Sequence, residues 1–166
     1  SGRRYKFNFP SEWTKELGQI LGWVVGDGWL REGDKNCRLG LTFSKDDKEI
    51  LNYFKPIINS WYGYDIKEVE RENGVTHLSY HGKYFIEFFS FLGIEAWKSA
   101  EKKIPESIYT APKEAVIGFL QGLFTADGTV NFRQGQSSYV RLTAKSLRLL
   151  KGAQLLLLNL GIKSRI

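Results

Sequence analysis

The sequence predicts an α+β protein in which one folding unit occurs twice. Two similar segments support this: residues 17–28 and 117–128 both carry small residues at every fourth position, and both end in Asp-Gly, 100 residues apart. A Leu-Thr pair, a lysine and an apolar helical pattern then follow each segment in the same order. Each copy is therefore expected to run helix, strand, strand, helix and extended segment.

Composition narrows the class of protein. The 166 residues are 42% hydrophobic and 25% charged, which is typical of a folded globular chain. The single cysteine excludes an internal disulfide framework and a cysteine-rich zinc site. With 24 Lys+Arg against 18 Asp+Glu, the net charge of +6 favours a polyanionic partner. The sequence shows neither a membrane-length apolar run nor a signal peptide, so we expect no membrane partner and a cytoplasmic location.

The first element of each copy is a helix rich in glycine. The patterns predict helices over residues 12–26, with Ser11 as N-cap, and over residues 113–126. Each interior glycine costs about 1 kcal/mol relative to alanine, a cost that close packing of two backbones would offset. We expect the two helices to pack through their small faces, the alternative being that each stripe lies against a sheet. The interface glycines would be Gly18, Gly22, Gly118 and Gly122.

Strands and a second helix follow in both copies. Residues 37–43 alternate, and residues 139–143 are expected to place Val140 and Leu142 inward. Helical patterns over residues 50–58 and 149–158 each close on a glycine before a short extended segment. The outward residues of the strands would be Arg38, Gly40 and Thr42 in the first copy and Tyr139, Arg141 and Thr143 in the second.

The first copy continues beyond the point where the second stops. Strands over residues 65–71 and 75–80 around Asn73-Gly74 form a hairpin signal, and a helix is expected over residues 84–92. The second copy has no matching hairpin or helix, which would leave an exposed sheet edge. The predicted organisation is a leader at 1–10, a first repeat at 11–95, a linker at 96–112 and an incomplete second repeat at 113–166.

The two Asp-Gly pairs predict a metal site. If the glycine-rich helices pair in parallel, Asp27 and Asp127 meet at their C-terminal ends. Two carboxylates about 4 Å apart repel by about 4 kcal/mol at an effective dielectric near 20, so the pair needs cations. Oxygen ligands suit Mg²⁺ or Ca²⁺ better than zinc. A single Asp-Gly is an ordinary turn at a helix end, whereas two copies behind matching stripes favour the metal.

These motifs resemble those of a known enzyme family. Residues 20–28 (ILGWVVGDG) and 120–128 (LQGLFTADG) resemble the paired motifs of the LAGLIDADG, or dodecapeptide, homing endonucleases. Residues 119–124 and 159–164 are most similar to the endonuclease domains found in inteins. The resemblance implies a pseudo-twofold pair of αββαββα repeats whose saddle-shaped antiparallel sheets lie over the DNA major groove, with the second repeat shortened here.

The resemblance also implies an activity and its cofactor. It implies a monomeric hydrolase that cuts both strands of a long, asymmetric DNA target. The metal ligands would be Asp27 and Asp127 with the adjacent Gly26 and Ala126. Mg²⁺ would be the cofactor, with Mn²⁺ able to substitute and Ca²⁺ able to bind without supporting cleavage. Catalytic lysines would surround the scissile phosphates, and Lys45 and Lys145 each lie 18 residues after an aspartate.

The predicted DNA surface follows the strands and their ends. Arginine and glutamine suit base edges and phosphates, although each residue alone is equally well explained as a solvated strand position. The candidates are Arg31, Arg38, Thr42, Arg133, Gln134, Gln136, Tyr139, Arg141, Thr143, Lys163 and Arg165. Two alternatives stay open: a non-cleaving nucleic-acid binder, such as an RNA maturase or a regulator, and a degenerate intein remnant. The residues that splice proteins are not found, so a splicing domain would belong to the parent chain.

Overall fold

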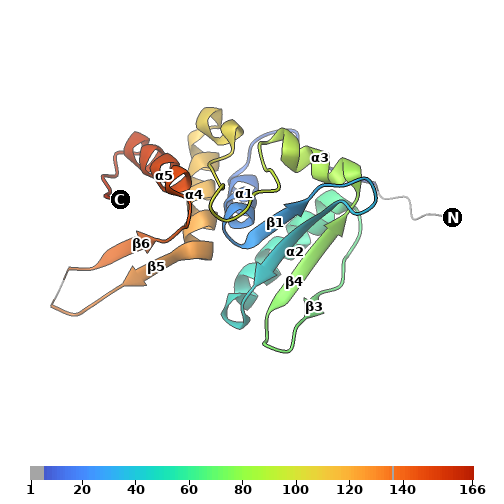
Figure 1. Ribbon diagram of the computed structural model, residues 1–166, viewed down its shortest axis with the longest axis horizontal. Coiled ribbons are helices and arrows are strands. Elements are labelled where there is room, and N and C mark those ends of the chain that lie inside the picture. The colour runs from blue at the N-terminus through green and yellow to red at the C-terminus, as the bar shows by residue number, and fades with distance from the viewer. Residues whose placement is uncertain (1–5, 136) are drawn as a thin grey trace. The chain divides into compact units, whose positions relative to one another are not determined.

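The computed structural model describes residues 6–135 and 137–166, and it confirms the α+β prediction (Figure 1). In chain order the described elements are α1 (Lys15–Asp27), β1 (Gly28–Arg31), β2 (Arg38–Phe43), the 3₁₀ helix η1 (Lys45–Asp47), α2 (Lys48–Tyr62), β3 (Val69–Glu70), β4 (Thr76–His81), α3 (Lys83–Phe91), η2 (Glu106–Thr110), α4 (Lys113–Asp127), β5 (Gly128–Asn131), β6 (Tyr139–Leu142) and α5 (Leu147–Asn159). No helix in this described part is long and apolar enough to cross a membrane.

The chain forms two compact units that do not coincide with the two repeats. One unit contains Asp27–Ala96 and the N-terminal segment up to Glu12, and the other contains Trp13–Gly26 and Trp97–Ile166. Helix α1 therefore packs in the same unit as α4, because its small residues lie against that helix. The predicted repeat boundaries describe a likeness in sequence and stay a prediction.

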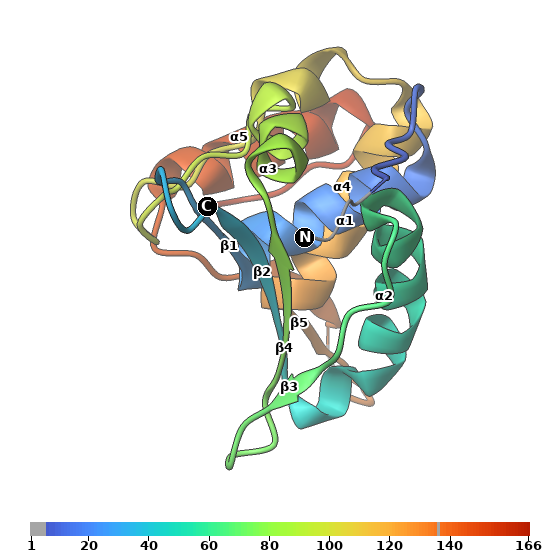
Figure 2. The same cartoon turned by 90° about the vertical axis from the view of Figure 1, so that its right-hand side faces the viewer.

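The first unit is built on an antiparallel sheet with strand order β1-β2-β4-β3. Alternation along β2 buries Leu39, Leu41 and Phe43 completely, as expected for a strand with one face in the core. Helix α2 contacts β2, and α3 contacts both β2 and β4 (Figure 2). Aromatic rings fill the space beneath, with the ring of Phe85 5.0 Å from that of Tyr62. The polar side chains of β2 lie on the opposite face of this sheet, away from the buried Leu39 and Leu41.

Several predicted boundaries were wrong. Helix α1 begins at Lys15 and not at residue 12, because the Thr14 hydroxyl, not Ser11, accepts a 3.1 Å hydrogen bond from the Leu17 amide. The extended segments expected after the second helices form no strand at residues 64–67 or 162–166. The strand expected at 65–71 is reduced to Val69–Glu70. The Asn73-Gly74 turn does join β3 to β4, and its glycine has a φ of 76°.

Helices α1 and α4 pack through their glycines in the second unit (Figure 1). A methyl group on Gly18 or Gly22 would overlap the carbonyl oxygen of Ala115 or Phe119, respectively. The relationship is reciprocal, because a methyl group on Gly118 or Gly122 would overlap the carbonyl oxygen of Lys15 or Gln19. Each stripe therefore lies against the other helix and not against a sheet.

The hairpin of the second unit is much more exposed than its counterpart in the first. Val130 is 72% exposed where Leu30 is 6% exposed, and Val140 is 61% exposed where Leu39 is fully buried. The expected burial of Val140 is therefore wrong. In the first unit β4 pairs with β2 and α3 packs beneath, whereas in the described part of the chain β6 pairs with β5 only. The apolar face of the second hairpin thus lacks the elements that cover the first.

Candidate metal and DNA-binding site

The C-terminal end of α4 carries a partly desolvated carboxylate. Asp127 is the last residue of α4 and is half-buried. Burial raises the pKa of its carboxyl group above the ordinary value, while the charge of Lys102 acts in the opposite direction. A Cβ atom placed on Gly26 would lie 2.5 Å from the Ala126 Cβ and 3.3 Å from Asp127 Oδ2. The ends of α1 and α4 therefore touch where the motifs end, and only glycine fits at position 26.

Lys102 is a functional candidate that the sequence pattern did not identify. Its Nζ donates a 2.7 Å hydrogen bond to the carbonyl oxygen of Gly26, and its charge acts on Asp127. It lies in the predicted linker at 96–112, which also contains Lys98 and Lys103. One local signal distinguishes Lys102 from the other basic residues of the linker. The pair Lys102-Lys103 directly precedes Ile104, which is buried, so the linker packs against the core at this point.

Ser146 connects Lys102 to α5. It is 1% exposed and is the N-cap of α5, where its Oγ accepts a 3.1 Å hydrogen bond from the Leu149 amide. The same hydroxyl donates a 2.5 Å hydrogen bond to the carbonyl oxygen of Lys102. Because this buried hydroxyl donates one hydrogen bond and accepts another, it ties the start of α5 to the backbone of Lys102. The backbone of Lys102 is therefore held from one side while its ammonium group binds the end of α1.

The oxygen atoms at the end of α4 are of the kind that hard divalent cations prefer. The Asp127 carboxylate lies next to the backbone of Gly26 and Ala126, and the C-terminal end of a helix carries negative potential. Asp27, also half-buried, ends α1 as Asp127 ends α4. Among the described residues no group of three or more His, Cys, Asp or Glu side chains could hold a metal. Mg²⁺ is usually bound by one or two carboxylates, and its remaining coordination positions are filled by water and substrate phosphate oxygens.

The two predicted catalytic lysines occupy equivalent places in the two repeats. Lys45 begins η1 just after β2, and Lys145 follows β6 and precedes the cap of α5. Both side chains are exposed, and across the described residues neither makes an ion pair. Their ammonium groups are consequently available to an external anion.

The outer face of the first sheet collects polar and basic side chains. Arg31, Arg38 and Thr42 lie on the face opposite the buried Leu39 and Leu41, in agreement with the alternation. The register adds residues that the sequence pattern left unassigned, because β4 pairs directly with β2. Thr42 Oγ1 lies 3.1 Å from His77 Nδ1, so the two share a hydrogen bond. The additional residues on this face are Trp29, His77, Ser79 and His81.

The hairpin of the second unit carries a similar but more exposed set. Tyr139 pairs with Asn131, whose side-chain amide donates a 3.1 Å hydrogen bond to the tyrosine oxygen. The Arg141 guanidinium lies 5.3 Å from the centre of the Tyr139 ring. Thr143 follows β6 and is exposed, as are Arg133 and Gln134 in the connection. Gln136 lies outside the described residues.

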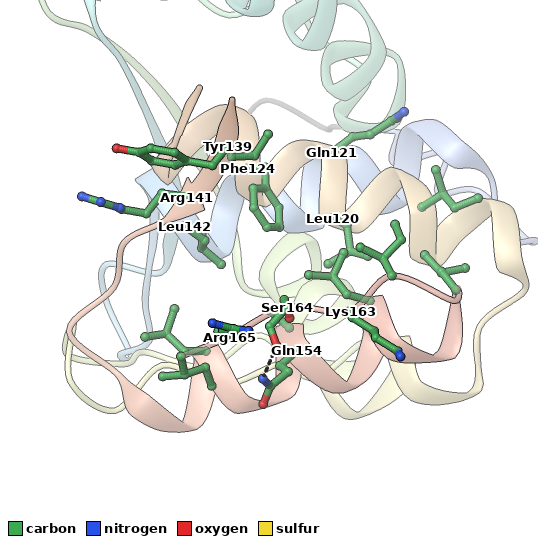
Figure 3. A pocket seen from close by; sticks show the side chains of 18 of the residues that line it. Leu120, Gln121, Phe124, Tyr139, Arg141, Leu142, Gln154, Lys163, Ser164 and Arg165 are labelled. Carbon is green, nitrogen blue, oxygen red and sulfur yellow. Dashed lines mark hydrogen bonds between the residues drawn. The ribbon is translucent and has the colours of Figure 1, made fainter. Parts of the chain in front are cut away.

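Lys163 and Arg165 lie after α5, in a groove that Tyr139 and Arg141 of β6 also line. This apolar groove of about 980 Å³ lies between α4, β6 and α5 (Figure 3). Gln154 Nε2 donates a 3.1 Å hydrogen bond to the Ser164 carbonyl oxygen, which holds the segment along the helix (Figure 3). Leu120, Phe124 and Leu142 are among the apolar residues of this groove.

The proteins that are similar in sequence are much longer than this chain, which matches one segment of each. A segment of a DNA polymerase of Thermococcus hydrothermalis is 30% identical over 153 residues, which are 90% of this chain and 9% of that protein. A segment of the probable translation initiation factor IF-2 of Methanocaldococcus jannaschii is 29% identical over 161 residues, or 94% of this chain and 12% of that protein. The chain thus spans about a tenth of the length of these curated relatives.

Solved structures and a family model agree with the motifs. The fold is similar to mesophilic variants of the homing endonuclease I-DmoI, with a TM-score of 0.66 and 19% identity over 91% of this chain and 79% of that one. It is also similar to I-DmoI in complex with DNA and Ca, with a TM-score of 0.62 and 17% identity over 91% and 74% of the two chains. Residues 114–166 match the model of the LAGLIDADG-like domain. The chain therefore has the fold of the homing endonuclease I-DmoI over most of its length, and its residues 114–166 are similar to the LAGLIDADG-like domain.

Proposed function

We propose that the chain is a site-specific DNA endonuclease that hydrolyses a phosphodiester bond in each strand with the help of divalent metal ions. The observation that carries this proposal is the arrangement at the end of α4. There the half-buried Asp127 lies against Gly26, the residue before Asp27, and Lys102 binds the Gly26 carbonyl. Such a group of a desolvated carboxylate and a fixed cation is suited to binding metal and phosphate together.

The proposed metal ligands are Asp27 and Asp127, with the backbone oxygens of Gly26 and Ala126. The Gly26 oxygen would bind a metal only if the Lys102 ammonium, from which it accepts a hydrogen bond, turns toward a phosphate. Burial penalises the charged carboxylate of Asp127, and a bound cation would reverse this penalty. Mg²⁺ bound there would acidify a water molecule and stabilise the charge of the attacking and leaving oxygens. Structures of I-DmoI variants in complex with target DNA were obtained in the presence of Mn and Mg, which supports divalent metal use. We expect Mn²⁺ to substitute for Mg²⁺ and Ca²⁺ to support binding only.

The lysines supply positive charge around the reacting phosphates. Lys45 and Lys145 project from equivalent places after β2 and β6, and both are exposed. Preorganised cations near a phosphate stabilise the charge that develops in the transition state. Lys102 adds a third cation whose position is fixed by its hydrogen bond to Gly26.

The DNA would lie against the polar strand faces. A net charge of +6 suits the phosphate backbone, and arginine and glutamine side chains on strands suit base edges in the major groove. The residues proposed to contact DNA are Arg31, Arg38, Thr42, Arg133, Gln134, Tyr139, Arg141 and Thr143, with Lys163 and Arg165 at the border. Because the two repeats present different side chains, the target would be long and asymmetric and a monomer would suffice.

The relatives suggest how the chain occurs in nature. Similar segments lie within proteins as different as a DNA polymerase and a translation initiation factor. A segment that recurs in proteins with unrelated activities behaves as an insert. We infer that the chain is of the intein endonuclease type, with a splicing domain in its parent chain.

The proposal can be tested by selecting DNA ligands. A pool of random duplexes is selected in Ca²⁺, and the enriched duplexes are then exposed to Mg²⁺. A long two-part consensus that is cut in Mg²⁺, together with loss of cutting and retained binding in Asp27→Asn and Asp127→Asn, is the expected result. Enrichment without cleavage by the unaltered chain would support a non-cleaving binder, and no enrichment at all would support a degenerate remnant. Cutting that persists in both variants would overturn the assignment of the metal ligands.

A further inference from the structure

We propose that Trp29 is a positioning residue that holds Arg38 in place to recognise a guanine in the first half of the target. The inference rests on the proposed function, which supplies DNA as the ligand. It goes further by naming the platform, the residue it orients and the base that is recognised.

The register of β1 and β2 sets up the arrangement. Trp29 pairs directly with Gly40. Two residues further along the strands, Arg31 pairs with Arg38, so these side chains share one face of the sheet. A Cβ atom on residue 40 would overlap Cε2, Cζ2 and Nε1 of the Trp29 indole, so the indole lies against the bare backbone of β2. Glycine is required here to make room for the ring. A tryptophan laid flat in this manner presents its face to the neighbouring side chain.

Arg38 lies on that indole. Its guanidinium carbon is 4.7 Å from the centre of the Trp29 ring, within the range of a cation–π interaction. Its Nε is buried and has no hydrogen-bond partner among the described residues. In the same part of the chain no carboxylate forms an ion pair with it. The guanidinium is therefore oriented by the ring while its hydrogen-bonding capacity remains unused.

A second buried polar atom nearby also lacks a partner. Ser79 pairs directly with Gly40 across β2 and β4, so it lies on the same face beside the indole. Its Oγ is buried with no hydrogen-bond partner among the residues that the structure describes. Buried polar groups that are left unpaired cost free energy, so an added hydrogen-bond partner at this place on the sheet would be favourable.

The geometry favours a base over a phosphate. Arginine normally loses about 2 kcal/mol of side-chain entropy when it is fixed, and stacking on Trp29 removes most of that freedom before DNA arrives. A planar, fixed guanidinium matches the O6 and N7 atoms of guanine, which is the commonest specific contact in the major groove. A phosphate accepts hydrogen bonds from many directions and would gain little from such a fixed orientation.

The second repeat offers a natural comparison. Arg141 lies 5.3 Å from the Tyr139 ring, but both residues are exposed and the tyrosine is held by Asn131. This looser pair lacks the buried, unpartnered Nε seen at Arg38. It therefore provides an arginine–aromatic pair in which loss of the ring should matter less.

The test compares consensus sequences selected in Ca²⁺ by the unaltered chain and by Trp29→Leu, Trp29→Phe, Arg38→Ala and Tyr84→Leu. Tyr84 is 73% exposed on α3 and serves as the aromatic control. Arg38→Ala should abolish the preference for guanine at one position, and Trp29→Leu should weaken the preference at that same position about tenfold. Trp29→Phe should keep most of it, and Tyr84→Leu should change nothing.

The second half of the consensus is the internal control for folding, because a variant that still selects it is folded and binds DNA. If Trp29→Leu keeps the guanine, or weakens every position equally, the inference is overturned while the proposed function stands. If the unaltered chain enriches no duplex, both the proposed function and this inference are wrong.

Discussion

Lys102 Nζ donates a 2.7 Å hydrogen bond to the carbonyl oxygen of Gly26, in the last turn of α1. The last carbonyl groups of a helix have no intrahelical partner and carry partial negative charge. Lys102 therefore satisfies one of them, and its charge also reaches Asp127. A residue of the linker is in this way built into the place where the motif helices end.

Replacing this lysine should impair cleavage more than binding. In Lys102→Met the cation is lost while the aliphatic part of the side chain remains. We expect the Mg²⁺-dependent cleavage rate to fall by about 10²-fold or more, because a preorganised charge near the reacting phosphate is removed. Affinity for DNA in Ca²⁺ should change little. Single-turnover cleavage and filter binding on the same duplex measure the two effects.

The neighbouring lysine is the matched control. Lys103 Nζ lies 3.8 Å from the exposed carboxylate of Glu106, and a long ion pair to an exposed group contributes little. Lys103→Met should cleave at nearly the rate of the unaltered chain. Equal losses in the two variants would mean that general basicity, and not the position of Lys102, matters.

The stability of the protein should depend on the charge of Asp127. Burial raises the pKa of this carboxyl group, so the folded state binds the proton more tightly than the unfolded state. The resulting stabilisation is present below the unfolded pKa of about 3.9 and is lost as pH rises through the higher folded pKa. At pH 7 the ionised Asp127 is therefore a destabilising group.

Asp127→Asn should accordingly raise the melting temperature at pH 7 and have almost no effect near pH 3. Mg²⁺ should raise the melting temperature of the unaltered chain at pH 7 more than that of the variant. Differential scanning calorimetry at the two pH values measures this, with Asp34→Asn as an exposed control. A variant less stable than the unaltered chain at pH 7 would contradict the expectation.

A methyl group between the motif helices should destabilise the second unit. In Gly122→Ala the new methyl group would overlap the Gln19 carbonyl oxygen, and backbone atoms cannot move aside cheaply. Overpacking of this kind costs about 1–3 kcal/mol or more, although alanine is the better helix former. Gly33→Ala, with no atom within 4 Å of the new group, is the control and should be neutral. Urea unfolding compares them, and equal midpoints would exclude close helix packing.

Removing the Ser146 hydroxyl should affect both stability and catalysis. Ser146→Ala loses an N-cap, worth about 1 kcal/mol, and removes the hydroxyl that donates a hydrogen bond to the Lys102 carbonyl. We expect lower stability and, because Lys102 is less well held, a lower cleavage rate at temperatures where the variant is folded. Ser146→Thr should restore both. Thr14→Ala, which removes an exposed cap at the N-terminal end of α1, should reduce stability slightly and leave cleavage unchanged.

Local patterns in the sequence were sufficient for most of the helices and strands, although not for all of their ends. The four-residue spacing of Gly18 and Gly22, repeated at Gly118 and Gly122, reports a helix face that no side chain can occupy. The Asn73-Gly74 turn and the alternation along β2 are also local, since backbone conformation and strand pleat depend on neighbouring residues. Equal offsets from Asp27 and Asp127 were enough to select Lys45 and Lys145 as candidates.

Apart from the pairing of the two glycine-rich helices, the tertiary structure decided which distant residues meet. Lys102 contacts Gly26 across 76 positions in the chain, and no local period records such a contact. Val140 has the pattern of a buried strand residue but is 61% exposed, because its burial depends on elements that lie outside its own strand. Trp29 rests on Gly40 because the register of two strands brings them together. Periodicity in a sequence shows which face of an element is apolar, whereas close packing between elements determines what that face touches.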